Sequence, residues 1–228
     1  MFVKDVMDKK SAFLDADDSL RKALDALHGA RDHIIPVMSR GKLGGVLTEH
    51  NLRRPYPREE GFFDVKKFFD FLENNRVRRL MTTDPLVVLE NESLQEAAGR
   101  MLDRDVSMAV VKDINGNVTG TVSRKAILNG LLAATGHGKE GMTIALRIDE
   151  RAGALKDATD VIRKHGGSIH SILSLEDESS KRKRQVCIRM KPVAPDSLER
   201  MKLDLEPDAE VLYTLDHGED GKGGREKP

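Results

Sequence analysis

The sequence is poor in several features that mark particular classes of protein. It has one cysteine, Cys187, in 228 residues, so no disulfide can form within the chain. Lysine and arginine together number 38, as do aspartate and glutamate, so net charge does not favour nucleic acid or an anionic membrane as a partner. No apolar run approaches the roughly 20 residues of a membrane-spanning helix, and Met1–Asp5 lacks the apolar core of a signal peptide. We therefore expect a cytoplasmic protein with no membrane or nucleic-acid partner.

Motifs that carry catalysis are also missing. No Walker phosphate loop, zinc motif or nucleophile elbow occurs in the sequence. Cys187 alternates with apolar neighbours in a strand-like run, which favours an inert thiol over a nucleophile. The basic run 181–184 stands at a predicted hairpin tip beside acidic residues, which favours a solvated loop. We expect a protein that is not an enzyme, requires no cofactor and holds no metal. An enzyme with an unrecognised site is kept as an alternative.

What the sequence does contain is an internal repeat. Each copy has an apolar lead segment, an amphipathic helix, two short strands and the start of a second helix, in the order β-α-β-β-α. The copies occupy residues 1–54 and 76–135, and their separation is constant until a turn near Asp113 adds one residue. Because neither copy is large enough to bury a good core, we expect the two to pack as one domain, residues 1–135.

The insert between the copies, residues 55–75, is unusually aromatic. Five of the seven phenylalanines in the chain fall within it. Such a stretch is not typical of a solvated linker, and we predict a helix over 64–74 that packs on the repeat pair or on a second subunit. Packing is favoured over a ligand-binding box.

The rest of the chain has a different pattern. Residues 140–216 alternate strand and helix signals in the order β-α-β-β-α-β, which is the ferredoxin-like order. The segment 217–228 is composed mainly of glycine and charged residues, and we predict it to be disordered. The fold class expected from these patterns is α+β.

Both copies of the repeat resemble CBS motifs (cystathionine β-synthase motifs). The first carries the resemblance in Ile35-Pro36-Val37 and in the run Gly45-Val46-Leu47-Thr48-x-x-Asn51-Leu52. The second is weaker, with Val110-Val111 and Gly120-Thr121-Val122-Ser123. The resemblance implies a CBS motif pair joined in antiparallel fashion, with two clefts for adenine nucleotides such as AMP, ATP or a related adenosine ligand. The residues implicated in nucleotide binding are Ile35, Pro36, Val37, Thr48, Asn51, Val110, Val111, Ser123 and Arg124.

The sequence departs from the family pattern, Gly-h-h-Thr/Ser-x-x-Asp, where h is apolar. In CBS pairs the aspartate takes the ribose hydroxyls and the hydroxyl residue meets phosphate. Here Asn51 replaces the first aspartate, so a ribose contact would lack charge, and Ala126 replaces the second, so its side chain cannot contact ribose. Thr48 has a second interpretation, a helix cap with no ligand. For Arg124 and Lys125, a solvated helix start is favoured over a phosphate contact.

The C-terminal module resembles an ACT domain through Asp149–Leu155 and Gly167-Ser168-Ile169. The resemblance implies a small ligand, often an amino acid, at a domain–domain interface beside the first strand-to-helix turn. Glycine in that turn permits close backbone approach, although Gly153 could serve the tight turn alone. The residues implicated are Asp149, Arg151, Ala152, Gly153, Ala154 and Leu155.

The order CBS–CBS–ACT is similar to the bacterial acetoin utilization protein B group. We therefore expect a non-catalytic regulatory homodimer that senses an adenine nucleotide through the CBS pair. An amino acid or small anion is the expected ligand of the ACT domain, and an unknown regulated protein is the expected partner. The alternative is a dimeric scaffold or interaction protein whose ligand sites have lapsed.

Overall fold

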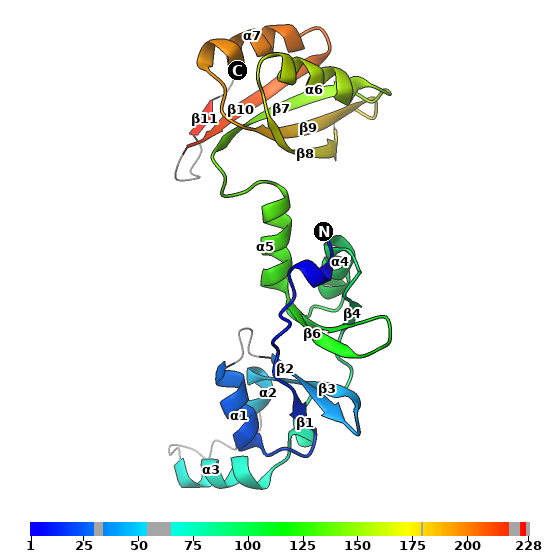
Figure 1. The fold of residues 1–228 in the computed structure, drawn as a ribbon, viewed down its shortest axis with the longest axis vertical. Helices are drawn as coiled ribbons and strands as arrows, with labels where there is room; N and C mark the ends of the chain where they lie inside the picture. The colour runs from blue at the N-terminus through cyan, green and yellow to red at the C-terminus, as the bar shows by residue number, and fades with distance from the viewer. Residues whose placement is uncertain (30–33, 54–64, 179, 219–223, 227–228) are drawn as a thin grey trace. The chain divides into compact units, whose positions relative to one another are not determined.

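We describe the protein from a computed structural model (Figure 1). The described residues are 1–29, 34–53, 65–178, 180–218 and 224–226. The chain divides into two compact units, Met1–Gly130 and Leu131–Pro228, and each is described by itself. In the described parts of the chain, none of the helices has the length and apolar character that a bilayer crossing needs.

The first unit contains two three-stranded sheets of the same topology (Figure 1). In both, the first strand is parallel to the middle one and the last is antiparallel to it, as the repeat predicts. The elements of the first copy and the insert are η1 (Val3–Asp5), β1 (Leu14–Asp15), α1 (Leu20–Gly29), β2 (Ile34–Ser39), β3 (Lys42–Thr48), α2 (Glu49–Arg53) and α3 (Val65–Asn74). Those of the second copy are η2 (Val77–Arg79), β4 (Val87–Leu89), α4 (Leu94–Asp103), β5 (Met108–Lys112), β6 (Val118–Ser123) and α5 (Arg124–Ala134).

Helix α3 accounts for part of the aromatic insert. It begins at Val65, within one residue of the predicted start, and contacts α1. Leu72 is fully buried, and Phe68 and Phe71 pack against the core of the first copy. Packing on the repeat pair is therefore what the described part of the insert does. Phe62 and Phe63 lie outside the described residues.

Each copy contributes its N-terminal segment to the other copy. The main chains of Asp8 and Thr121 exchange hydrogen bonds of 2.8 and 3.1 Å, and those of Val46 and Thr82 exchange bonds of 3.0 and 2.8 Å. The same reciprocity holds at the helix starts, in the bridges Phe2–Ser93 and Ser19–Arg76. The N-terminal apolar segment of each copy therefore pairs with the sheet of the other copy. Neither copy can form these bridges without its neighbour.

Two glycines allow this exchange. A Cβ on Gly45 would stand 2.4 Å from the carbonyl oxygen of Thr82, and a Cβ on Gly120 would stand 2.2 Å from that of Asp8. No side chain fits at either distance because the obstacle is main chain. The glycine that opens each Gly-h-h-Thr/Ser run is thus a site where one backbone crosses another.

A small apolar cluster joins the two sheets of the first unit. It consists of Ile34 and Val46 from the first copy, with Met108 and Val110 from the second. All four are 9% exposed or less. Their alternation along the strands is what puts them on one face, because neighbours such as Ile35 and Val37 lie in the core of the first copy instead.

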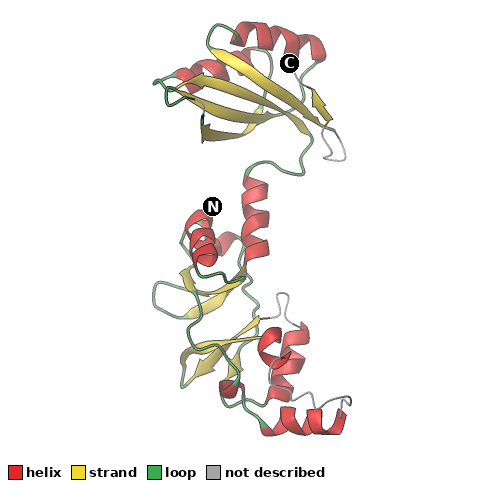
Figure 2. Ribbon diagram, turned by 180° about the vertical axis from the view of Figure 1, so that it is seen from behind, coloured by secondary structure: helices red, strands yellow, loops and turns green. Residues whose placement is uncertain are grey.

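The second unit is one antiparallel sheet with two helices on one face (Figures 1 and 2). Its strand order, β11-β10-β7-β9-β8, contains the expected β-α-β-β-α-β chain order with the first and third strands central. The core alternates along β7 as Met142, Ile144, Leu146 and Ile148. The elements are β7 (Gly141–Asp149), α6 (Ala154–Lys164), β8 (Ile169–Glu176), β9 (Lys183–Met190), α7 (Pro195–Leu205), β10 (Ala209–His217) and β11 (Gly224–Glu226).

The C-terminal segment differs from its prediction. Composition predicts disorder from residue 217, but β11 pairs in antiparallel register with β10, Leu215 opposite Arg225. The physical reason is that β10 would otherwise be an edge strand with unpaired main-chain groups, and any extended segment that returns to it can satisfy them.

Candidate functional site

A cleft of about 410 Å³ opens between the two copies of the repeat. Its apolar part is the cluster that joins the two sheets, and its polar part comes from the end of β3 and from two segments of the second copy. The lining residues are Ile34, Val46, Thr48, His50, Asn51, Thr82, Asp84, Pro85, Leu86, Asp105, Val106, Ser107, Met108 and Val110. An apolar floor with convergent polar groups is the usual composition of a small-molecule site.

Thr48 and Asn51 form a reciprocal cap at the start of α2. The amide oxygen of Asn51 accepts hydrogen bonds from the main-chain N–H of Thr48 at 2.9 Å and from its hydroxyl at 2.7 Å. The main-chain N–H of Asn51 donates in return to the Thr48 hydroxyl at 3.2 Å. Because a main-chain N–H can only donate, the oxygen of Asn51 must face inward and its NH₂ outward, toward the Thr82 hydroxyl at 3.4 Å. Asn51 therefore presents a donor to the cleft.

The opposite wall of the cleft is fixed by Arg124. Its main-chain N–H donates to the carbonyl oxygen of Ser107 at 2.8 Å, and its guanidinium donates to that of Val106 at 2.9 Å. The same guanidinium lies 3.5 Å from the carboxylate of Asp105, which has a left-handed φ of 47°. The sequence makes Arg124 a nucleotide-binding candidate but favours a solvated helix start for it; in the structure its guanidinium and main-chain N–H bond the wall-forming segment 105–107.

The predicted nucleotide-site residues separate into two groups. Thr48, Asn51 and Val110 line the cleft. Ile35 and Val37 are fully buried in the core of the first copy, and Val111 is fully buried as well. Pro36 is buried and stands opposite Val46 in the sheet register. The strand alternation explains the split, because adjacent residues of one strand face opposite sides.

The corresponding position of the second copy has less to offer a ligand. Ser123 is 6% exposed, and its hydroxyl accepts the main-chain N–H of Ala126 at 3.1 Å. Ala126 has no polar side-chain group that could bond the Ser123 hydroxyl as the amide of Asn51 bonds that of Thr48. By the repeat, the counterpart of the wall 105–107 falls at 31–33, which lies outside the described residues.

Sequence reasoning missed most of the cleft wall. Thr82, Asp84, Pro85 and Leu86 follow the lead segment of the second copy and reach the cleft because that segment crosses to β3. The signal that could have found them is the pair Leu80-Met81, which repeats Val6-Met7 in front of an otherwise polar run.

Ion pairs hold the turn that the sequence predicts as a ligand site in the second unit. Gly153 adopts φ 89° at the start of α6, which explains glycine there. Arg151 bridges Asp157 at 2.9 Å and Asp208 at 3.2 Å, so it ties this turn to the one before β10. Arg151, Ala152 and Gly153 are exposed, whereas Ala154 is buried and Leu155 packs against the core.

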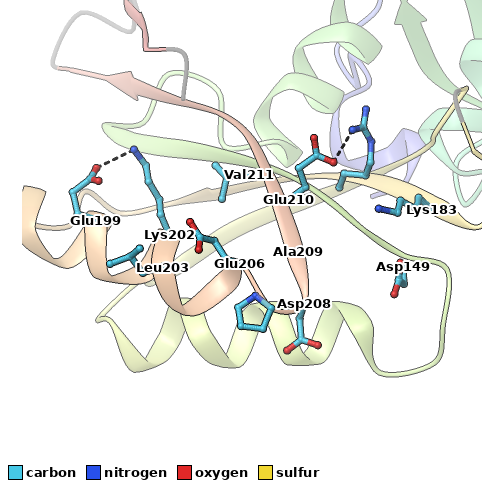
Figure 3. A pocket seen from close by; sticks show the side chains of 12 residues that line it. Asp149, Lys183, Glu199, Lys202, Leu203, Glu206, Asp208, Ala209, Glu210 and Val211 are labelled. Atoms are coloured by element: carbon cyan, nitrogen blue, oxygen red, sulfur yellow. Dashed lines mark hydrogen bonds and ion pairs between the residues drawn. The ribbon is translucent and has the colours of Figure 1, made fainter.

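A second cleft of about 650 Å³ lies between α7 and the strands near that turn (Figure 3). Asp149 lines it, together with side chains of both charges such as Arg147, Lys202 and Glu210. Arg147 pairs with Glu210 at 2.8 Å and with Asp177 at 2.5 Å. Asp177, expected in a solvated loop, is buried, because this ion pair compensates its charge.

Comparison with known proteins agrees with this architecture. The sequence model of the CBS domain family matches residues 3–57 and 77–133. A CBS domain-containing protein of Dictyostelium discoideum is 28% identical over 137 residues, which cover 58% of this chain and 92% of that protein. A CBS-pair protein of Arabidopsis thaliana superimposes with a TM-score of 0.50 at 24% identity, over 58% of this chain and 94% of its own.

The match to an enzyme is partial. A homoserine O-acetyltransferase of Methanococcus vannielii is 23% identical over 128 residues, and only 24% of that enzyme is covered. Two intertwined β-α-β-β-α modules with a cleft between them define a paired repeat. The matched residues identify that pair: the chain carries a CBS domain pair.

Proposed function

We propose that this protein is a non-catalytic regulatory protein that senses an adenine nucleotide in the cleft beside Thr48 and Asn51. One observation carries the proposal: the cleft combines an apolar floor with a hydroxyl, an amide and a helix start, and both copies of the repeat contribute to it. An adenine ring would meet the apolar floor, and the sugar would meet the outward NH₂ of Asn51. CBS domains are in general regulatory modules rather than catalytic ones.

The charge of the cleft supports a nucleotide with few phosphates. Among the described lining residues there is no lysine or arginine, and Asp84 and Asp105 are both present. Each carboxylate has an arginine partner, Arg104 for Asp84 at 3.2 Å and Arg124 for Asp105 at 3.5 Å, so the cleft has no excess positive charge to hold a triphosphate. We therefore expect AMP or a nucleoside to bind more tightly than ATP.

Calorimetric titration of the full chain tests the nucleotide proposal. CBS pairs of other proteins have been solved with AMP and with ATP, which makes these the first probes, followed by S-adenosylmethionine and NAD. A ligand at about 100-fold excess over its Kd should stabilise the protein by roughly 2.7 kcal/mol in a thermal-shift measurement. If no member of the panel releases heat or shifts the melting temperature, the nucleotide proposal fails.

A pair of threonine variants localises the binding. Thr48→Val removes the hydroxyl that bridges Asn51 and the helix start, and AMP affinity should fall by about tenfold. Thr119→Val is the matched control, since Thr119 is half-buried on β6 and does not line the cleft. Equal affinities for the two variants would place the nucleotide elsewhere.

The second unit enters the proposal as an ACT-type module that binds an amino acid or small anion and pairs two chains. Its β-α-β-β-α-β order and the ordered turn around Gly153 support this reading. Edge strand β8 exposes Ile172, Leu173 and Leu175 by 37, 47 and 57%, and an uncovered apolar edge of this kind favours strand pairing between copies. The proposed homodimer should have twice the 25.4 kDa chain mass in light scattering, and Leu173→Lys should reduce it to one.

The cytoplasmic location, the regulated partner and membership of the acetoin utilization group are parts of the same proposal. They derive from the domain order and from composition. The alternative, a dimeric scaffold with lapsed sites, is favoured by one observation: the amide oxygen of Asn51 is already used within the cap. A dimer that binds no member of the nucleotide panel would select the scaffold.

A further inference from the structure

A buried arginine in the second unit has no partner for its charge among the described residues. Arg189 on β9 is 9% exposed, and its guanidinium donates one hydrogen bond, from Nη2 to the carbonyl oxygen of Lys139 at 2.6 Å. Its Nε is the buried side-chain nitrogen that has no partner in the described part of the chain. No described carboxylate forms an ion pair with it. A carbonyl oxygen satisfies a donor but does not neutralise the cation, and a buried charge without a counter-ion is costly.

Hydroxyl side chains flank this arginine on the same face of the sheet. Ser171 on β8 and Thr143 on β7 stand directly opposite Arg189 in the sheet register. Ile144 and Ile188, their neighbours along the strands, lie in the core beneath the two helices. Since successive side chains point to opposite faces, Thr143 and Arg189 lie on the face away from α6 and α7.

The end of β10 adds a histidine to the same place. His217 stands opposite Gly141 in the sheet register, and its Nε2 lies 2.8 Å from the Thr143 hydroxyl. Burial, followed by the charges of Arg189 and His137, lowers the pKa of His217 below its ordinary value, against the opposing effect of Asp216. The charge of Arg189 therefore acts on the imidazole of His217.

The segment that leads into β7 closes over the arginine. The Ser171 hydroxyl donates to the carbonyl oxygen of Thr135 at 2.8 Å, and Gly136 adopts φ 74° directly above the guanidinium. A Cβ on Gly136 would stand 3.3 Å from Cδ of Arg189 and 3.6 Å from Nε. Within the segment 135–139, the carbonyl oxygen of Lys139 is the group that bonds the guanidinium.

We propose that Arg189, Thr143 and His217 form a binding site for one oxyanion group, a carboxylate or a phosphate, of a small ligand. A guanidinium presents donors in a fork that matches such a group, and the Thr143–His217 pair, which spends one proton on its own hydrogen bond, keeps one more to donate. The site lies at the start of β7, whereas the turn 149–155 follows its end, so the two are separate and this inference does not depend on the proposed function.

The test is a titration of the full chain with inorganic phosphate and, separately, with acetate, at constant ionic strength. Calorimetry gives the affinity, and the imidazole resonances of His217 report the location by NMR. We expect saturable binding of at least one anion with a shift of the His217 resonances. The stronger anion distinguishes a phosphate-bearing from a carboxylate-bearing ligand.

Two substitutions and a control complete the test. Arg189→Met removes the cation and should weaken anion binding at least about tenfold; Arg189→Lys keeps the charge, serves if the methionine variant does not fold, and should bind in between. Arg200→Met is the control, because Arg200 is exposed and makes no interaction in the described chain. Absence of binding by both anions, or equal binding by the Arg189 and Arg200 variants, would overturn the proposal.

Discussion

The two copies of the repeat share a backbone but not a binding chemistry. Gly45 and Gly120 allow the same main-chain crossing, and the bridges that follow from it are reciprocal. At the start of the second helix of each copy, the hydroxyl of Thr48 bonds both the side-chain amide and the main-chain N–H of Asn51, whereas the hydroxyl of Ser123 bonds the main-chain N–H of Ala126 alone. Residues that build the fold are therefore kept in both copies, and the residues proposed to contact a ligand differ between them. Each prediction below tests one level of that difference.

The largest effect should come from the shared glycines. Gly45→Ala and Gly120→Ala place a methyl group within 2.4 Å and 2.2 Å of a carbonyl oxygen. Since the crossing backbones must separate, each variant should lose about 3 kcal/mol of unfolding free energy in urea denaturation. Similar losses would support structural equivalence of the two crossings.

Gly99→Ala provides the control for the glycine variants. Gly99 lies inside α4, and nothing stands within 4 Å of an added Cβ. This variant should gain up to about 1 kcal/mol, because alanine favours helix. Gly45→Ala with the stability of Gly99→Ala would contradict the account of the crossing.

A medium change in nucleotide affinity is expected from adding a carboxylate at the start of the second helix of either copy. Asn51→Asp keeps an oxygen for the two Thr48 donors and replaces the outward NH₂ with a second acceptor. A ribose hydroxyl would then donate to a charged group, and AMP affinity should rise by about tenfold in calorimetry. No rise would indicate that the amide is not what limits binding.

Ala126→Asp is the same test in the second copy. The new carboxylate would lie in the first turn of α5, where the helix dipole favours it by about 0.3–1 kcal/mol. A higher melting temperature without any nucleotide affinity would mean that this copy lacks more than its carboxylate. Acquired affinity would mean that the two copies differ at this position alone.

A smaller difference should separate the two helix caps. Ser93 forms a complete capping box with Glu96, whereas the Ser19 hydroxyl accepts one bond, from Lys22, at 3.3 Å. Ser93→Ala should cost about 1 kcal/mol and Ser19→Ala about half of that in urea denaturation. A larger loss of stability for Ser19→Ala than for Ser93→Ala would show that the capping box does not govern helix stability here.

The smallest effect concerns the hairpin turns and pH. In the second copy, hydrogen bonds from the Asn117 side chain and then from main-chain N–H groups, partly opposed by burial, hold the pKa of Asp113 below its ordinary 3.8. A lowered folded-state pKa stabilises the hairpin above that ordinary value, and the effect is lost as pH falls through the folded pKa. The first copy has Ser39 at this position. The protection factor against amide exchange should therefore fall at Asn117 on acidification, and not at Lys42.

Local patterns were sufficient for the elements of this chain. Leu20, Ala23 and Leu27 predict the buried face of α1, and alternation predicts β7 with its core side. The insert helix followed from its phenylalanines, and the order of strands and helices followed in both units. These features depend on spacing within one segment, which a sequence displays directly.

The cleft wall depends on contacts that spacing does not display. Thr82 reaches the site only because its segment crosses to β3. Arg124, which lies on a different element, donates a hydrogen bond to the carbonyl oxygen of Val106. The buried state of Asp177 likewise depends on Arg147, thirty residues earlier in the chain. Each case is a long-range pairing, so composition and periodicity could not assign it.

The exchange of lead segments has a consequence for the origin of the pair. A single ancestral unit would have had no sheet of its own for its lead segment, but a second identical unit would have offered one through the same bridges. Two such units would have formed a swapped dimer before they were joined.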